Sequence, residues 1–249
     1  MSLSAENYIR IFFNKFFWRQ HPEAALRYWP VVREIKKANL EKSKILEVGS
    51  GSLGIVPYLK RAIEGVDIDF SGPQTKFLNK IKGEAASLPF GKNSYDVAIS
   101  VDVIEHLESE KRLKAIYELL RVAKNLAIIV VPAGSLSEDQ DRKLDLYFQK
   151  EFGYKNQFLK EHVLNGLPKV EEMLVAIDKS LRKLNKKAEV ESYPNLNLVI
   201  REILMRTWIS KNKFFYYLYL KGFLLILPLL KSANFGNCYR RVFVVEFAS

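Results

Sequence analysis

The sequence predicts an α/β protein built on a doubly wound, mostly parallel β-sheet, and three observations support this fold class. An apolar strand pattern within residues 45–55 ends in glycines and leads directly into a helical pattern. Further apolar segments rich in β-branched residues alternate with helical patterns along the chain. The length of 249 residues suits one such domain with additions, and 48% hydrophobic with 27% charged residues is a globular composition.

The glycine turn has the features of a nucleotide-binding site. Gly49 lets the chain bend sharply, and Gly51 lets a ligand approach the backbone where a Cβ would block it. The helix that follows offers unpaired N–H groups at its start. Gly54 completes a G-x-G-x-x-G pattern, so the glycines alone leave open both a dinucleotide site and a structural turn without a ligand.

Glu47 precedes the first glycine by two residues, at the end of a strand that we expect to be buried. A buried carboxylate is costly without a partner, which a cationic ligand or the N–H groups of the turn would supply. The ammonium group of S-adenosylmethionine meets this need, whereas the pyrophosphate of a dinucleotide does not. The segment Glu47-Val48-Gly49-Ser50-Gly51 resembles the first motif of class I S-adenosylmethionine-dependent methyltransferases, although the third glycine, Gly54, comes one position later than usual.

Asp67 lies near the end of the next predicted strand, 18 residues after Gly49. Dinucleotide-binding and methyltransferase folds both place an acid here to accept hydrogen bonds from ribose hydroxyls. Asp69 is the alternative, and an exposed strand-end carboxylate without a ligand is a third interpretation. By the resemblance, Asp67 and the adjacent Ile68 belong to the cofactor site.

The segments 83–90 and 93–100 distinguish the methyltransferases from the dinucleotide-binding proteins. They resemble the pattern G-[DE]-A-x-x-L-P-F, followed by S-[FY]-D, of the class I branch that acts on small molecules, the methyltransferase type 11 group. The resemblance implies that Glu84 accepts from the adenine amine and that Ala85 offers a backbone N–H. It also implies a Rossmann-like sheet of seven strands, mostly parallel, in which the last strand, at 241–247, is antiparallel.

The fourth predicted strand runs into Asp102 and then Glu-His at residues 105–106. This strand end is similar to one that faces the methyl group and the acceptor in the family. Asp102 is therefore predicted at the cofactor pocket, and His106 is the catalytic candidate, as general base for an acceptor that must lose a proton. Capping or packing is the alternative role for His106. No spacing of cysteines and histidines indicates a metal site, so none is predicted.

The chain is predicted to form a single methyltransferase domain, 1–249, around this core. Residues 1–40 form a helical cap with an aromatic stripe at Tyr8, Phe12 and Phe16, and Pro30 separates its two helices. The other parts are a cofactor-binding core at 41–135, a lid or helical region at 136–186 and C-terminal strands at 187–249 with an apolar helical insertion at 196–231. Helices are expected at 55–62, 111–124, 167–184 and 196–208, and strands at 63–68, 126–131 and 188–193.

An apolar run at residues 214–230 is the second informative feature. A spanning helix needs about 20 apolar residues, and Lys221, Gly222 and Pro228 interrupt this shorter run. A membrane-interface helix, a buried core helix and a dimer contact are the three interpretations. The net charge is +11, and residues 203–245 contain no acid, which indicates an anionic partner such as a phospholipid surface, or a basic surface without special use. No RNA-binding motif is present, so nucleic acid is not expected.

Together these features predict an S-adenosylmethionine-dependent methyltransferase that transfers the methyl group in line to a small-molecule or lipid-like acceptor. One alternative is an NAD(P)-dependent oxidoreductase, against which Glu47 and the Leu-Pro-Phe segment count. Another is a non-catalytic membrane-surface or nucleic-acid-binding protein on a methyltransferase fold. The lone Cys238 and the absence of a signal-peptide pattern predict a cytoplasmic protein, peripheral at the membrane if the apolar run binds lipid.

Overall fold

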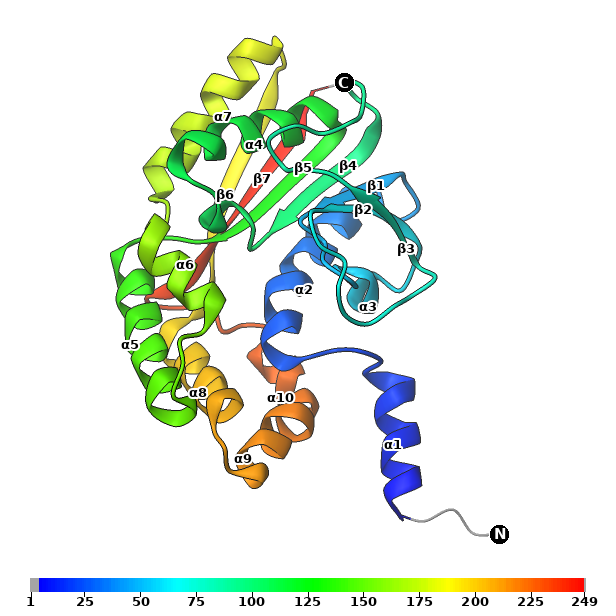
Figure 1. Cartoon of the computed structure of the whole chain (residues 1–249). Helices are drawn as coiled ribbons and strands as arrows, with labels where there is room; N and C mark the ends of the chain where they lie inside the picture. The colour runs from blue at the N-terminus through cyan, green and yellow to red at the C-terminus, as the bar shows by residue number, and fades with distance from the viewer. Residues whose placement is uncertain (1–4, 249) are drawn as a thin grey trace.

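A computed structural model describes residues 5–248, so the first four residues of the predicted cap lie outside the described part. One sheet has the strand order β3-β2-β1-β4-β5-β7-β6 (Figure 1). Its strands are β1 (Ile45–Val48), β2 (Ile63–Asp67), β3 (Leu78–Lys82), β4 (Tyr95–Val101), β5 (Ala123–Pro132), β6 (Ala188–Asn197) and β7 (Cys238–Phe247). Strands β1 to β5 pair in parallel, and β7 runs antiparallel to β5 and β6. The predicted fold class is confirmed.

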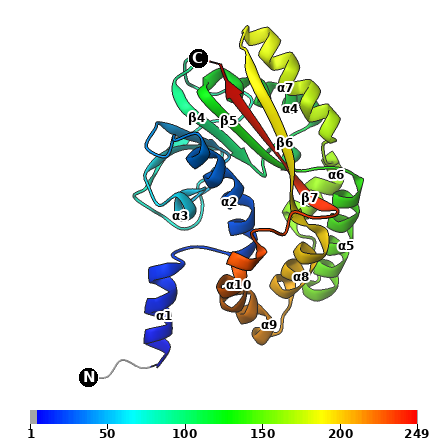
Figure 2. The same ribbon diagram turned by 180° about the vertical axis from the view of Figure 1, so that it is seen from behind.

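Helices cover both faces of this sheet, as the two opposite views show (Figures 1 and 2). On one face α4 (Ser109–Val122) and α7 (Val170–Leu184) pack against the strands through a large apolar cluster. On the other face α2 (Pro22–Lys37) and α3 (Val56–Leu59) form a second cluster with the same strands. The strands between these helices are nearly continuous apolar segments, because a parallel sheet is buried on both faces.

Three further helices extend the domain beyond the sheet. α5 (Ser135–Phe152), α6 (Gln157–Asn165) and α8 (Leu198–Ile209) share a small core of Leu144, Phe148, Leu159 and Ile209. The polar segment before residue 152, which the sequence leaves open as helix or lid, is one continuous helix. The 3-10 turn η1 (Ile104–His106) follows β4 and contacts α6.

The predicted apolar insertion is helical throughout. It comprises α9 (Lys213–Tyr217), a π-helical turn η2 (Leu218–Gly222) and α10 (Phe223–Leu230), and it packs on α1 (Ala5–Phe16) and α2. By length and composition this run could cross a membrane, and only 17% of it is buried. The buried-helix interpretation therefore holds for Tyr219, Leu224 and Leu227 but not for most of the run.

Two helix predictions are wrong in their boundaries. Pro30 lies inside α2 instead of separating two helices; the break falls at residues 17–21, before Pro22. A proline within a helix leaves a carbonyl four residues earlier without its partner, and Asn195 Nδ2 donates to Leu26 O at 3.3 Å in compensation. The helix predicted at 55–62 ends already at Leu59, because Lys60 takes a left-handed conformation that terminates it.

Candidate cofactor and active site

The glycine turn joins the ends of β1, β2 and β4. Gly49 N donates to Val66 O at 2.7 Å, and a Cβ on Gly49 would overlap the side chain of Val103, which follows β4. Gly51 has a φ of +52°, and no atom lies within 4 Å of the place where its Cβ would be. The first glycine is therefore required by packing, whereas the second leaves open space beside the backbone.

Glu47 supports this turn from inside the protein. Its side chain is fully buried; Tyr28 Oη donates to Oε1 and Ile55 N to Oε2, each at 2.7 Å. Gly54 is needed because a Cβ there would overlap Oε2. Burial raises the pKa of Glu47 to about 7, against the lowering effect of these two hydrogen bonds. The buried carboxylate thus has a protein hydroxyl and a backbone N–H group as its partners. Contact between Glu47 and a cofactor ammonium stays a prediction.

Asp67 ends β2 beside the turn. Its Oδ2 accepts from Gly51 N at 2.7 Å and its Oδ1 from Asp69 N at 3.1 Å. The side chain of Asp69, the alternative, is exposed and accepts from the N–H and the hydroxyl of Ser71. Ile68 between them is also exposed. The structure therefore brings Asp67, and not Asp69, to the glycine turn.

The remaining predicted cofactor residues lie around the same strand ends. Ser50 is buried, and its Oγ donates to Gly51 O at 3.2 Å. The segment after β3 is tied to β2 because Gly83 N donates to Asp67 O at 3.1 Å. Glu84 follows with an exposed side chain, and Ala85 packs partly buried against the core. An exposed carboxylate near Asp67 is compatible with the adenine role that the resemblance implies.

Asp102, which the sequence predicts at the cofactor pocket, belongs to an ion-pair network. It has a φ of +52° directly after β4, and Arg27 Nη1 on α2 donates to Oδ2 at 2.8 Å. Arg240 on β7 donates from Nε to Oδ1 at 2.8 Å and from Nη2 to Oδ2 at 2.6 Å, and it also pairs with Glu23. Burial acts to raise the pKa of Asp102, but the guanidinium groups of Arg240 and Arg27 hold it well below its usual range. Asp102 therefore has a structural partner set that its sequence position does not reveal.

His106 lies in a cluster of titratable groups that the sequence analysis missed in part. Its Nδ1 is 2.8 Å from Glu161 Oε2, and its Nε2 is 3.3 Å from His162 Nε2 on α6. His162 Nδ1 in turn is 2.8 Å from Asp141 Oδ2. Burial, followed by the neighbouring His162, lowers the pKa of His106. A base role for His106 stays a prediction.

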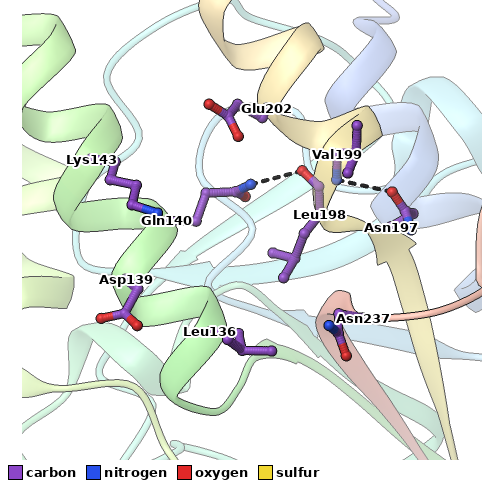
Figure 3. A pocket seen from close by; sticks show the side chains of 9 residues that line it. All are labelled: Leu136, Asp139, Gln140, Lys143, Asn197, Leu198, Val199, Glu202 and Asn237. Carbon is purple, nitrogen blue, oxygen red and sulfur yellow. Dashed lines mark hydrogen bonds between the residues drawn. The ribbon is translucent and has the colours of Figure 1, made fainter.

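The hollow drawn in Figure 3 lies apart from the predicted site. It measures about 380 Å³ between α5, α8 and the residues before β7. Its lining is polar in part, and Gln140 Nε2 donates to Leu198 O at 2.7 Å across it. No residue of the glycine turn lines it, so we do not assign the cofactor to this hollow.

Comparison with known proteins agrees with this geometry. Residues 46–131 match the family model described as a methyltransferase domain. The chain is 28% identical over 113 residues to the human "Probable tRNA methyltransferase 9B", and 30% identical over 125 residues to "tRNA (carboxymethyluridine(34)-5-O)-methyltransferase" of Arabidopsis thaliana. These matches cover 43% and 47% of this chain but only 23% and 30% of the relatives, so the chain spans less than a third of either.

Solved structures show the same fold at low sequence identity. The methyltransferase domain of bacterial CtHen1 superposes with a TM-score of 0.53 at 17% identity, covering 91% of this chain and all of that domain. Phosphoethanolamine N-methyltransferase 2 of Haemonchus contortus, in complex with S-adenosylmethionine, gives 0.51 at 15% identity, covering 97% of this chain and 60% of that one.

Residues 46–131 therefore form a methyltransferase domain, and the motifs and the sheet order of the chain are similar to those of class I S-adenosylmethionine-dependent methyltransferases. S-adenosylmethionine is accordingly its cofactor, which supplies an electrophilic methyl group. The residues present fit it: open space lies beside the Gly51 backbone, the carboxylate of Asp67 ends β2, and that of Glu84 comes shortly after β3. These groups would hold the cofactor through its ribose and adenine.

Replacing Gly51 by leucine should abolish cofactor binding. The new side chain fills the open space beside the turn, so affinity for S-adenosylhomocysteine should fall roughly 100-fold or more, a loss of about 2.8 kcal/mol. Isothermal titration calorimetry measures this. Gly153→Leu is the matched control, because Gly153 also has positive φ and open space but caps α5. Equal affinity in a folded Gly51→Leu protein would contradict the assigned site.

The buried Glu47 should make stability depend on pH. An unfolded carboxyl releases its proton near pH 4.5, whereas folded Glu47 keeps it until about pH 7, so the unfolded state binds fewer protons between these values. The free energy of unfolding should therefore fall by about 3 kcal/mol as pH rises through this window, relative to Glu47→Gln. Urea unfolding of both proteins at pH 4.5, 6 and 8 tests this; parallel pH profiles would show that burial does not raise the pKa of Glu47.

Neutralising Asp102 should destabilise the fold. Asp102→Asn leaves the guanidinium of Arg240, which is nearly inaccessible, without its main counter-charge, and loss of one partner of a buried pair costs about 3 to 5 kcal/mol. Asp178→Asn is the control, since its ion pair with Arg182 is exposed and should contribute about 1 kcal/mol or less. Urea unfolding at pH 7 compares the two, and equal small losses would show that the network adds nothing.

Proposed function

We propose that the protein transfers a methyl group from S-adenosylmethionine to a small-molecule or lipid-like acceptor at a membrane surface, and that it is cytoplasmic and peripheral. The observation that carries this proposal is an exposed apolar face on α9, η2 and α10. This apolar face comprises the exposed side chains of Phe214, Phe215, Tyr217, Leu225 and Leu229. Large contiguous apolar patches on soluble proteins mark interaction sites.

Helix α1 also carries an exposed aromatic stripe. Tyr8, Phe12 and Phe16 were expected to pack as a cap, but each is exposed, Tyr8 by 60%. Phe13, on the other side of α1, packs in one cluster with Tyr219 and Leu224, which places α1 beside the π-helical turn. Two adjacent elements thus present aromatic side chains outward, and aromatic side chains are favoured at membrane interfaces.

Basic side chains lie within and on both sides of the apolar run in the sequence. Lys211, Lys213, Lys221 and Lys231 are exposed in a stretch without acids. Lys221 Nζ lies 4.4 Å from the ring centre of Phe13, and Lys231 Nζ lies 4.7 Å from that of Trp29. Apolar burial combined with about 1 kcal/mol of surface attraction per base favours an anionic lipid surface.

The chemistry asks little of the protein beyond alignment and exclusion of water. The acceptor must be oriented for in-line displacement near the glycine turn. An acceptor hydroxyl or protonated amine must also lose a proton, and His106 is the candidate base, with its Nδ1 held by Glu161. Glu161 fixes the imidazole so that Nε2 carries the basic lone pair.

Transfer RNA is the second candidate acceptor. Both curated relatives carry names of tRNA methyltransferases, and the chain has a net charge of +11. A basic chain would bind phosphate backbones in a salt-dependent way. A direct methyl-transfer assay distinguishes tRNA from a lipid-like acceptor.

Vesicle co-sedimentation tests the membrane proposal. Intact protein should sediment with anionic vesicles at low salt and less at high salt, and not with neutral vesicles. Leu229→Asp should reduce sedimentation at least about tenfold, because Leu229 is 80% exposed at the end of the apolar face and an aspartate there opposes insertion. The variant Leu224→Asp is unsuitable, since Leu224 is buried and its loss would damage the core.

Val175→Asp is the matched control for this experiment. Val175 is 51% exposed on α7, which lies at the opposite end of the molecule from α9 and α10 in both views. Equal sedimentation of Leu229→Asp and Val175→Asp would contradict the membrane proposal. Size-exclusion chromatography reports the dimer alternative, in which Leu229→Asp converts a dimer to a monomer.

Radiolabelled methyl transfer then identifies the acceptor class. Extracted lipids, small metabolites and bulk tRNA are offered in parallel with S-adenosylmethionine, and label in the lipid or metabolite fraction is the expected result. Label in tRNA alone would overturn the acceptor proposal. Calorimetry with NAD, expected to show no binding, distinguishes the oxidoreductase alternative.

A further inference from the structure

Three potential metal ligands converge beyond the end of β4. Glu105 and His106 belong to η1, and His162 belongs to α6, which packs against that turn. The Nε2 atoms of the two histidines are 3.3 Å apart, and Glu105 Oε1 lies 3.9 Å from each. Two ligand atoms about 2.1 Å from one tetrahedral ion would be about 3.4 Å apart. The two nitrogens therefore already have the separation of two ligands of a single metal ion.

The outer hydrogen bonds fix both imidazoles with Nε2 directed inward. Glu161 Oε2 and Asp141 Oδ2 each lie 2.8 Å from the Nδ1 of His106 and His162, respectively. Asp141 is held in turn by Arg201 Nη2 at 2.8 Å and by Tyr239 Oη at 2.7 Å. A carboxylate on Nδ1 selects the tautomer whose free lone pair is on Nε2, and metal-bound histidines are oriented in this way.

Glu105 is the unexplained member of the cluster. Its side chain is 0% exposed, and neither carboxylate oxygen has a hydrogen-bond partner among the described residues. A buried carboxylate without a partner is strongly unfavourable, and Asp102, the neighbouring acid, adds repulsion. A cation between these three facing acceptors would compensate the Glu105 carboxylate and separate the two Nε2 lone pairs.

We infer that Glu105, His106 and His162 bind a divalent transition-metal ion with open coordination positions. Two imidazoles and one carboxylate suit Zn²⁺, Fe²⁺ or Mn²⁺ better than Ca²⁺ or Mg²⁺, which prefer oxygen ligands. His106 is partly exposed, which gives the ion an entry path. The sequence analysis predicts no metal because only the adjacent Glu105 and His106 are visible as a pair, while His162 follows 56 residues later.

The site lies beside the glycine turn. Val103 fills the space where a Cβ of Gly49 would be, and Glu105 follows two residues later. Resting on the proposed methyl transfer, an ion here would bind an acceptor through oxygen and lower the pKa of that oxygen, so that an alcohol or phenol is the favoured acceptor class. Metal ligation uses the Nε2 lone pair that a general base would need.

Metal binding is tested without any acceptor. The full chain is stripped with a chelator, dialysed and titrated with Zn²⁺ by calorimetry, and the visible spectrum is recorded with Co²⁺. We expect about one ion per chain and a d–d absorption of a site with nitrogen and oxygen ligands. Glu105→Gln and His162→Gln should each weaken Zn²⁺ binding at least about 100-fold, and Glu161→Gln, which removes an outer partner, about 10- to 100-fold.

His21→Gln is the matched control, because His21 is the third histidine of the chain and lies outside the cluster. It should leave Zn²⁺ affinity unchanged. Stability gives a second readout: Zn²⁺ added to the metal-free protein should raise the melting temperature of the parent protein but not that of Glu105→Gln. Absence of stoichiometric binding, or equal losses in His21→Gln and His162→Gln, would overturn the inference and indicate a proton shared by the histidines. Neither result depends on methyl transfer, so failure of the proposed function would be seen separately.

Discussion

The carboxylate of Asp102 is the point on which the arrangement around the site depends. It joins Arg27 of helix α2 to Arg240 of the last strand, and Arg240 is 138 residues from Asp102 in the sequence. Arg240 also pairs with Glu23, so two acids and two bases share one largely buried network. Such a network contributes less to net stability than to a unique arrangement, because its charges are costly unless every partner is in place. It holds the cap helix and the closing strand at the end of β4.

Glu47 links the end of β1 to helix α2, as Asp102 links the end of β4 to the same helix. Glu47 is the next-to-last residue of β1 and Asp102 directly follows β4, and each acid accepts a hydrogen bond from α2, through Tyr28 and Arg27 respectively. Helix α2 therefore does more than cover one face of the sheet. It fixes the polar groups at two adjacent strand ends, and the glycine turn lies between them with Gly54 against Glu47 and Gly49 against Val103.

Local signals in the sequence predicted most of the fold and part of the site. The glycine turn, Asp67 and the strand patterns depend on near neighbours, so periodicity and turn residues reveal them. Tyr28, Arg240 and His162 were missed because each meets its partner only through the tertiary fold, without a periodic or spacing signal. Pro30 was wrongly predicted to separate two helices. The Leu26 carbonyl that it leaves without a helical partner accepts a hydrogen bond from Asn195 on a distant strand, which the sequence does not reveal. For Asp102 and Glu47 the cost of burial was foreseeable, but the identity of the partner was not.

The histidine cluster bears on how an acceptor could lose its proton. A base at His106 needs a free Nε2, yet that atom lies 3.3 Å from the Nε2 of His162, and Glu161 already occupies Nδ1. Either a proton or an ion must separate the two lone pairs, and an ion there would also give the Glu105 carboxylate the partner that it lacks among the described residues. Asp141, the partner of His162, accepts a hydrogen bond from Arg201 on α8, and α8 precedes α9 in the chain. Helix α8 thus connects the hydrogen-bond partners of the histidine cluster to the segment that carries the exposed apolar side chains.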